Sequence, residues 1–234
     1  MRVLVTRPRP DADTTAALLR ARGHVPLVVP LLEIVPLAPG QPFGIRDVQA
    51  FLVTSANGAR VLAAATPARS VRVFAVGAAS AETARAAGFD HVESADGDVE
   101  TLAALVTACL VPSGGRLIHA AGSVSAGDLG GTLEKAGFDV EKKALYRAET
   151  PEVLPAALES LLRDGGIDAA LFYSPRTART FADLVNRAGL VEKLADIDAF
   201  CLSRAVAEGL ESLPFSDVQV SYTPEQAQLL ELLG

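Results

Sequence analysis

Cysteine, histidine and tryptophan are scarce in this sequence, and their scarcity excludes several kinds of site. The 234 residues include two cysteines, three histidines and no tryptophan. Cys109 and Cys201 lie far apart without the spacing of metal ligands, which argues against a disulfide framework and a dedicated transition-metal site. Cys201 falls in an apolar run and Cys109 in a helical pattern. We therefore expect both to be small buried hydrophobic residues in a reducing compartment.

The sequence also lacks a basic excess and long apolar runs. Its net charge of -7 and pI near 5.0 argue against a nucleic-acid-binding surface. The apolar stretch at residues 3–5 is too short for a signal peptide or a membrane span, so we expect a cytoplasmic protein. The glycine-rich signatures of dinucleotide and P-loop nucleotide binding are missing, as is the Gly-x-Ser-x-Gly turn of hydrolases.

What the sequence does contain is a regular alternation of short apolar runs and helical periodicity. Hydrophobic residues make up 50% of the chain, enough for a sizeable core. The predicted strands are residues 3–6, 25–29, 51–54, 71–76, 117–119, 169–173, 199–202 and 218–220. Strict alternation of strand and helix predicts an α/β protein with parallel sheets and helices on both faces.

Two helix starts carry recognisable capping signals. Asp98 precedes a stripe of apolar residues spaced for one helix face over 99–110, and we predict it as the N-cap. We also predict Thr223 as an N-cap, because Pro224 would be the first helical residue and Gln226 would stand at the capping-box position.

The chain repeats its own pattern, which bears on its domain organisation. Three pairs of segments match in order: 4–23 with 118–137, 52–55 with 172–174, and 74–82 with 200–208. These matches define four modules in chain order: A (1–36), B (50–110), A′ (115–148) and B′ (166–234).

Any A module together with any B module supplies about five strands, the size of a flavodoxin-like doubly wound sheet. Two such domains can form from A with B and A′ with B′, which gives contiguous domains. They can equally form from A with B′ and B with A′, which gives one split and one inserted domain. Periodicity alone does not choose between these pairings.

The junctions between modules resemble each other. Residues 30–36 and 144–149 occupy matching places in the repeat and have extended patterns. Proline-rich linkers follow them, with Pro39 and Pro42 after the first and Pro151 after the second. Two extended crossings side by side would make a narrow two-stranded hinge, which would leave two domains free to open and close on a ligand.

Candidate binding residues follow the predicted strands in both halves of the chain. Ligands of open parallel sheets bind beyond the carboxyl ends of the strands, where helix N-termini present free N–H groups. The residues at these places are Arg7, Thr54, Ser55, Asn57, Gly77, Ser80, Gly122, Ser174 and Ser203. Small hydroxyl residues there form sockets for carboxylates or phosphates. Serine and threonine also cap helices without any ligand, so the set indicates an anion site more strongly than any single member does.

Two residues are candidates for proton transfer. Tyr146 lies at the second extended crossing, and its phenol can donate or accept a hydrogen bond. His119 lies near the end of a predicted buried strand, where we favour a structural, hydrogen-bonded imidazole over a catalytic one.

Several of these segments together resemble the uroporphyrinogen-III synthase family. The similar segments are Val5-Thr6-Arg7-Pro8, Thr54-Ser55-Ala56-Asn57-Gly58, residues 76–88, Leu145-Tyr146, Tyr173-Ser174-Pro175 and Tyr222-Thr223-Pro224. Each motif has low specificity, but together they span essentially the whole chain in the family's order.

The resemblance implies the split arrangement of domains. One domain would comprise residues 1–35 and 149–234, and the other residues 38–146, with linkers near 31–37 and 145–150. The resemblance also implies a monomeric lyase that uses no metal or organic cofactor.

The implied substrate is hydroxymethylbilane, a linear tetrapyrrole with eight carboxylates. Loss of its terminal hydroxyl gives an azafulvene, and the far pyrrole attacks through its substituted carbon to give a spiro intermediate. Collapse of that intermediate inverts the last ring, whereas closure without the enzyme proceeds without inversion. By the same resemblance Tyr146 is the candidate acid, and the turn residues above would anchor the carboxylates.

This chain departs from the family pattern at two turns. Many relatives have a Gly-x-Thr-Ala-like sequence where Ser203-Arg204-Ala205-Val206 stands here, and often an arginine near His119-Ala120-Ala121. Three alternatives therefore stay open: a regulatory paralogue, a two-lobed binding module for an anionic small molecule, and a nucleotide-sugar transferase. The missing phosphate loop and acidic metal motif disfavour the transferase.

Overall fold

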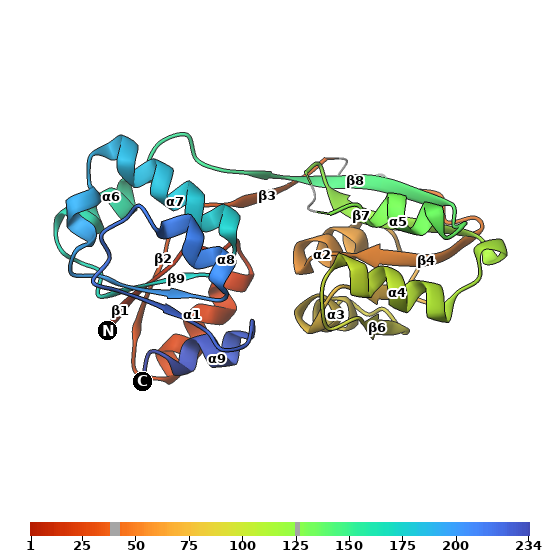
Figure 1. Ribbon diagram of the computed structural model, residues 1–234, viewed down its shortest axis with the longest axis horizontal. Coiled ribbons are helices and arrows are strands. Elements are labelled where there is room, and N and C mark those ends of the chain that lie inside the picture. Colours follow the sequence, from red (N-terminus) through yellow and green to blue (C-terminus); the bar gives the residue numbers. More distant parts are fainter. Residues whose placement is uncertain (38–42, 125–126) are drawn as a thin grey trace. The chain divides into compact units, whose positions relative to one another are not determined.

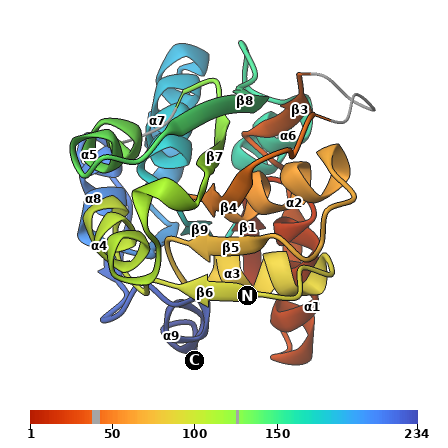
Figure 2. The ribbon, with the colours of Figure 1, turned by 90° about the vertical axis from the view of Figure 1, so that its right-hand side faces the viewer.

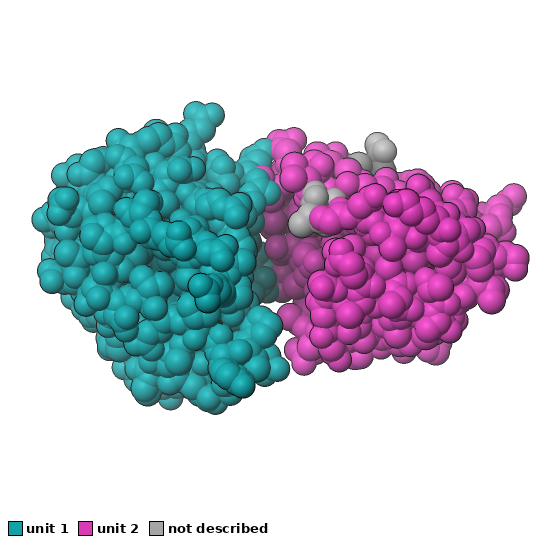
Figure 3. All heavy atoms as spheres, in the orientation of Figure 1, with its two compact units in different colours: residues 1–33, 149–234 teal, residues 34–148 magenta. Residues whose placement is uncertain are grey.

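The computed structural model describes residues 1–37, 43–124 and 127–234, which form two compact units. Unit 1 comprises Met1–Glu33 and Glu149–Gly234, and unit 2 comprises Ile34–Ala148 (Figure 1; coloured separately in Figure 3). The linker prolines Pro39 and Pro42 lie outside the described residues.

Unit 1 is built from both ends of the chain. Its elements are β1 (Arg2–Val5), α1 (Asp11–Ala21), β2 (Val25–Val28), α6 (Ala156–Arg163), β9 (Ala169–Phe172), α7 (Pro175–Ala188), η2 (Val191–Leu194), β10 (Asp198–Cys201), α8 (Arg204–Ala207), η3 (Glu208–Leu210), β11 (Asp217–Val220) and α9 (Gln226–Glu231). The strands are parallel in the order β11-β10-β9-β1-β2. Numbered within the unit and read from β2, this order is 2-1-3-4-5, which is that of flavodoxin-like sheets.

Helices cover both faces of the unit 1 sheet because its strands are apolar on both sides. Leu4 and Phe172 point to the face that packs on α6, α7 and α8. Val5 and Leu171, the next residues in register, point to the face covered by α1 and α9. The continuous apolar runs that predicted these strands follow directly from this double burial.

Unit 2 is built from the middle of the chain. Its elements are β3 (Glu33–Pro36), β4 (Val48–Val53), α2 (Ala56–Ala65), β5 (Arg72–Ala75), α3 (Ala78–Ala86), β6 (Val92–Ser94), α4 (Val99–Cys109), η1 (Pro112–Gly114), β7 (Arg116–Gly122), α5 (Leu129–Lys135) and β8 (Val140–Glu149). The sheet order is β3-β8-β7-β4-β5-β6, with parallel pairing from β8 to β6. In Figure 2, α4 and α5 lie on one side of the strands of this sheet and α2 lies on the other.

The two sheets are permuted versions of one arrangement. The spatial order β2-β1-β9-β10-β11 of unit 1 corresponds to β8-β7-β4-β5-β6 of unit 2. Module A therefore shares a sheet with B′, and module B with A′. The chain passes between the units in β3 and β8, which pair with each other, and the backbone N–H of Leu37 donates to the carbonyl of Leu145 at 2.9 Å. The predicted fold class, two doubly wound parallel-sheet domains with a two-stranded connection, is confirmed.

The two cysteines lie in different environments. Cys201 is fully buried on β10, as predicted, and burial raises the pKa of its thiol to about 12. Cys109 is exposed, so its predicted burial is wrong. It ends α4 away from the buried stripe of Leu102 and Val106, and its thiol contacts the Glu93 carboxylate at 3.6 Å.

The two capping predictions have opposite outcomes. The Asp98 carboxylate accepts from the backbone N–H of Thr101 at 2.9 Å and caps α4, as predicted. Thr223 is not an N-cap, because α9 begins at Gln226 and no side chain caps it. The Thr223 carbonyl instead accepts from the Ser221 hydroxyl at 2.6 Å, in a turn that delays the helix.

The described helices include none with the length and hydropathy that a bilayer-spanning segment requires.

Candidate functional site

The predicted site residues lie at the carboxyl ends of the parallel strands in each unit. In unit 2, Thr54 and Ser55 follow β4, Gly77 lies just beyond β5, and Gly122 ends β7. In unit 1 the corresponding places hold Arg7 after β1, Ser174 after β9 and Ser203 after β10. Because these strands are parallel, each set shares one edge of its sheet, which is the edge where α/β proteins bind ligands.

A serine and a tyrosine meet at this edge of unit 2. Ser55 is the N-cap of α2, and its hydroxyl accepts from the backbone N–H of Gly58 at 2.9 Å. The same hydroxyl lies 3.0 Å from the phenolic oxygen of Tyr146 on β8. Tyr146 as a whole residue is half-buried. The two residues are 91 positions apart in the sequence.

The backbone of β8 is irregular where it carries Tyr146. Ala121 pairs with Ala144, but Gly122 pairs with Tyr146, so Leu145 is an extra residue between the two pairs. Leu145 and Tyr146 are consecutive yet both pack against the core beneath α2. In a regular strand, neighbouring side chains point to opposite faces. The bulge therefore turns Tyr146 toward α2, as bulges beside functional sites commonly do.

His119 lies on β7 behind this edge and is 4% exposed. Its Nε2 is 3.4 Å from the Thr54 hydroxyl, at the long end of the hydrogen-bonding range. Burial, with a smaller effect from the charge of Lys142 on the neighbouring strand, lowers the pKa of His119 to about 4. The imidazole is therefore neutral at physiological pH, in agreement with the predicted structural role.

The lowered pKa of His119 makes stability depend on pH. Between pH 6.5 and about 4 the unfolded chain binds a proton that the folded chain does not, so stability falls as the pH falls through this window. At about 1.4 kcal/mol per pH unit the loss is roughly 3 kcal/mol. We expect His119→Leu to remove this loss, as measured by urea unfolding between pH 7.5 and 4.

The matched control for this variant is His91→Leu, which alters an exposed histidine of the same unit. It should keep the acid loss of the parent protein. If stability falls equally with pH in His119→Leu and in the parent protein between pH 6.5 and 4, His119 is not the source of the acid destabilisation.

The remaining predicted residues of unit 2 lie around the starts of α2 and α3. Asn57 accepts from the guanidinium of Arg60 at 2.8 Å, one turn along α2. Gly77 is the N-cap of α3 in an extended conformation, and its carbonyl accepts from the backbone N–H of Ser80 at 3.1 Å. Ser80 is 5% exposed. The first N–H groups of α3 have no intrahelical partner, as at any helix start, and they point to the carboxyl edge.

Arg7 of unit 1 is engaged by the protein itself. Its guanidinium donates to the Gln226 side-chain oxygen at 2.6 Å and forms an ion pair with Asp11 at 3.3 Å. It also lies 4.1 Å from the centre of the Tyr173 ring, a cation–π contact. Burial raises the pKa of Tyr173, and the nearby charge of Arg7 acts in the opposite direction. Arg7 therefore joins β1, α1, β9 and α9.

The two serines of unit 1 differ. Ser174 caps α7: its hydroxyl accepts from the backbone N–H of Thr177 at 3.2 Å and lies 2.9 Å from the Thr177 hydroxyl. Ser203 precedes α8 and makes no side-chain capping bond. The Ser203 hydroxyl therefore makes no hydrogen bond to its own helix, in contrast to that of Ser174.

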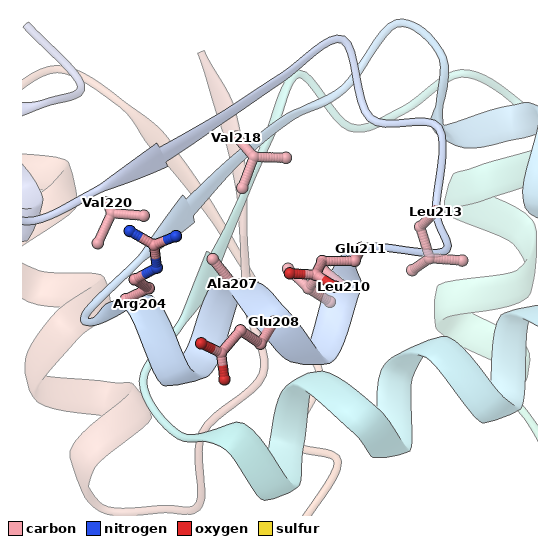
Figure 4. Close-up of a pocket in the computed structure, with 8 residues that line it drawn as sticks. All are labelled: Arg204, Ala207, Glu208, Leu210, Glu211, Leu213, Val218 and Val220. Carbon is pink, nitrogen blue, oxygen red and sulfur yellow. The ribbon is translucent and has the colours of Figure 1, made fainter.

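Three surface cavities of the described structure are lined by other residues. One of about 430 Å³ runs along α8 and η3 beside the edge strand β11, with Val218, Val220 and Leu210 in its wall (Figure 4). Another, of about 500 Å³, lies at the amino ends of β4 and β7, and a third of about 550 Å³ lies between α4 and α5. None of the three is lined by a predicted site residue.

Some residues shape the site through contacts with residues distant in the sequence, and these contacts were not predicted. Gly58 and Gly122 flank the Tyr146 ring, and Gln226 holds Arg7 from 219 positions away. In the sequence Gly122 stands out only as part of a turn, and Gly58 only within a motif. The pairing register of β7 with β8 places Gly122 beside the Tyr146 ring, and no sequence pattern indicates that register.

Comparisons with known proteins give one consistent result. The family model described as uroporphyrinogen-III synthase HemD matches residues 13–231. The structure of uroporphyrinogen-III synthetase from Helicobacter pylori has a TM-score of 0.66 at 14% identity, over 99% of this chain and 97% of that one. A mutant uroporphyrinogen III synthase from Thermus thermophilus has a TM-score of 0.56 at 22% identity, over 100% and 97% of the two chains. No curated protein matches the chain.

Proposed function

This chain belongs to the uroporphyrinogen-III synthase family, and on that premise we propose that Tyr146 supplies the proton that starts its reaction. Members of the family are cyclising lyases that close hydroxymethylbilane with inversion of the last ring. The alternatives of a regulatory paralogue, a binding module or a transferase are not favoured by the family match.

The first step is loss of the terminal hydroxyl of the substrate. The carbon–oxygen bond breaks, the leaving oxygen takes the phenolic proton of Tyr146, and water departs. The azafulvenium cation left behind is attacked by the far pyrrole through its substituted carbon, which gives the spiro intermediate. That intermediate opens and recloses through the unsubstituted carbon of the inverted ring, which then releases one proton. That proton returns to the phenolate, so the enzyme ends the cycle unchanged.

The observation that supports this role is the contact between Tyr146 and Ser55 at the carboxyl edge of unit 2. The 3.0 Å contact holds the phenolic oxygen beside the start of α2, and Tyr146 is only half-buried. A general acid must lie within hydrogen-bonding distance of the reacting group, and a phenol held by a neighbouring hydroxyl is suited to that task. The substrate supplies the other reactive groups, so the remaining task of the protein is to hold the reactive conformer.

The carboxylates of the substrate would bind the helix N-termini and hydroxyls at the same edges. Thr54, Ser55, Asn57, Gly77, Ser80 and Gly122 in unit 2, and Arg7, Ser174 and Ser203 in unit 1, are the proposed contacts. The support is their position: each lies at the start of a helix or at the end of a strand, where N–H groups and the helix dipole favour anions. Ser203 has the hydroxyl least used by its own helix.

We further propose that the protein acts as a cytoplasmic monomer on this small molecule, without nucleic acid. Its net charge of -7 disfavours a nucleic-acid surface. Both cysteines are free, as expected for a reducing compartment.

The product isomer tests the proposed function. Freshly generated hydroxymethylbilane is incubated with the protein, the products are oxidised, and type I and type III uroporphyrins are separated by chromatography. We expect type III in proportion to the protein added, since closure without catalysis gives type I. Only type I from folded protein would overturn the activity.

A further inference from the structure

The ring of Tyr146 lies in a slot that two glycines leave open. A Cβ atom on Gly122 would lie 3.0 Å and 3.1 Å from ring atoms Cε2 and Cζ. On the other side, a Cβ on Gly58 would lie 4.0 Å from Cε1, but only 3.0 Å from the Ala120 carbonyl oxygen. Both glycines are buried. Any side chain at position 122 would therefore push the ring by a few tenths of an ångström.

The hydrogen bonds of Ser55 bear on the direction of the phenolic proton. The serine hydroxyl has one proton to give and two lone pairs. It already accepts from the backbone N–H of Gly58 at 2.9 Å, and among the described residues the phenolic oxygen of Tyr146 is its one further side-chain partner. If Tyr146 donated to Ser55, the serine proton would have no acceptor in this contact. If Ser55 donates, it is the phenolic proton that has no acceptor among the described residues, and that proton points away from the serine, where a ligand can take it.

We propose that Ser55 and Gly122 are positioning residues for Tyr146. Gly122, opposite the bulge at Leu145, leaves the room in which the ring is held. Ser55 donates to the phenolic oxygen, directs the phenolic proton toward the substrate, and stabilises the phenolate formed when that proton leaves, because hydrogen bonds to charged oxygen are the stronger kind. This inference rests on the proposed role of Tyr146 as the acid.

The test is a pair of double-mutant cycles with Tyr146→Phe as the common partner. Ser55→Ala and Gly122→Ala are each measured in the parent protein and in the Tyr146→Phe background, for kcat, KM and the fraction of type III product. We expect Ser55→Ala to lower kcat about tenfold, the equivalent of one hydrogen bond. A rise in KM would report the separate carboxylate contact proposed for Ser55. Gly122→Ala should lower kcat about fivefold through displacement of the ring. In the Tyr146→Phe background neither change should lower kcat further, since no hydroxyl is left to position.

Matched controls separate positioning from stability. Asp98→Ala removes an N-cap of the same unit, and Gly130→Ala adds a Cβ where nothing lies within 4 Å. Both should leave kcat unchanged. Ser55→Asp keeps an oxygen acceptor for the N–H of Gly58 but can only accept from the phenol, so it should preserve stability to urea and still lower kcat at least tenfold.

The outcomes distinguish the two levels of the proposal. Multiplicative losses in the Tyr146→Phe background, with Tyr146→Phe itself slow, would overturn the positioning roles and leave the acid in place. An unchanged kcat in Tyr146→Phe would overturn both. Type III product from the parent protein stands apart from either result, because it reports the activity of the whole site.

Discussion

Tyr146→Phe is expected to lower kcat about 100-fold, the lower end of what a positioned general acid contributes. The variant keeps the ring, so its packing against the core beneath α2 should persist. Loss of the single contact with Ser55 should cost only about 1 kcal/mol of stability. As turnover slows, uncatalysed closure competes, and the product should shift from type III toward type I. Steady-state kinetics with separation of the two isomers measures both effects.

Tyr222→Phe is the control for removal of a phenolic hydroxyl. Tyr222 is 95% exposed, and its loss of a hydroxyl should change neither kcat nor the isomer ratio. Equal kcat values for Tyr146→Phe and the parent protein would remove Tyr146 from the chemistry. In that case a donor other than Tyr146 protonates the leaving hydroxyl.

Strands buried on both faces could be predicted from the sequence, because their apolar runs are continuous. This holds for β1, β9 and β10 in unit 1, which lie inside the sheet. The edge strand β6 could not, since Val92, Glu93 and Ser94 are only half-buried and make no apolar run. β7 extends beyond its predicted end, through Ala120 and Ala121 to Gly122, because small residues have weak strand signals even where they are fully covered.

The pairing of the four modules could not be derived from periodicity. Either pairing gives sheets with the same number of strands in the same spatial order. What distinguishes them is the partner of β1, which pairs with β9, a strand more than 160 residues further along the chain. Contacts between residues so far apart in the chain depend on the energy of the whole fold. Local sequence patterns carry little information about that energy.

For the candidate site, the sequence predicted where the residues lie along the chain but few of their side-chain contacts. Ser55 and Ser174 are recognisable as residues at helix starts, and both do cap their helices. The contacts of the other site residues could not be predicted. A one-residue bulge at Leu145 turns Tyr146 toward Ser55, and Gln226 of α9 accepts a hydrogen bond from Arg7. Such contacts depend on register, which a single inserted residue changes without altering composition or periodicity.

The largest stability effect is expected for Phe172→Ala. Phe172 is 0% exposed in β9, and its ring centre lies 5.2 Å from that of Phe181 and 6.1 Å from that of Phe215. Truncation of a buried phenylalanine costs about 3–5 kcal/mol, the lost transfer energy and the cavity combined. Native-state hydrogen exchange reads this cost amide by amide. We expect faster exchange in β9 and β10, and an equal acceleration in β1 and β2, which share the sheet but come from the other end of the chain.

Phe74→Ala provides the mirror experiment in unit 2. Phe74 is also 0% exposed and belongs to a core of unit 2 built on α4 and α5. Its truncation should accelerate exchange in β4, β5 and β7 and leave β1 and β9 protected. If Phe172→Ala instead loosened residues 149–234 while β1 and β2 kept their protection, the two ends of the chain would not unfold together. In a cooperative domain, loss of a core residue destabilises every strand of the shared sheet. Protection kept in β1 and β2 would therefore show that unit 1 is not one cooperative domain.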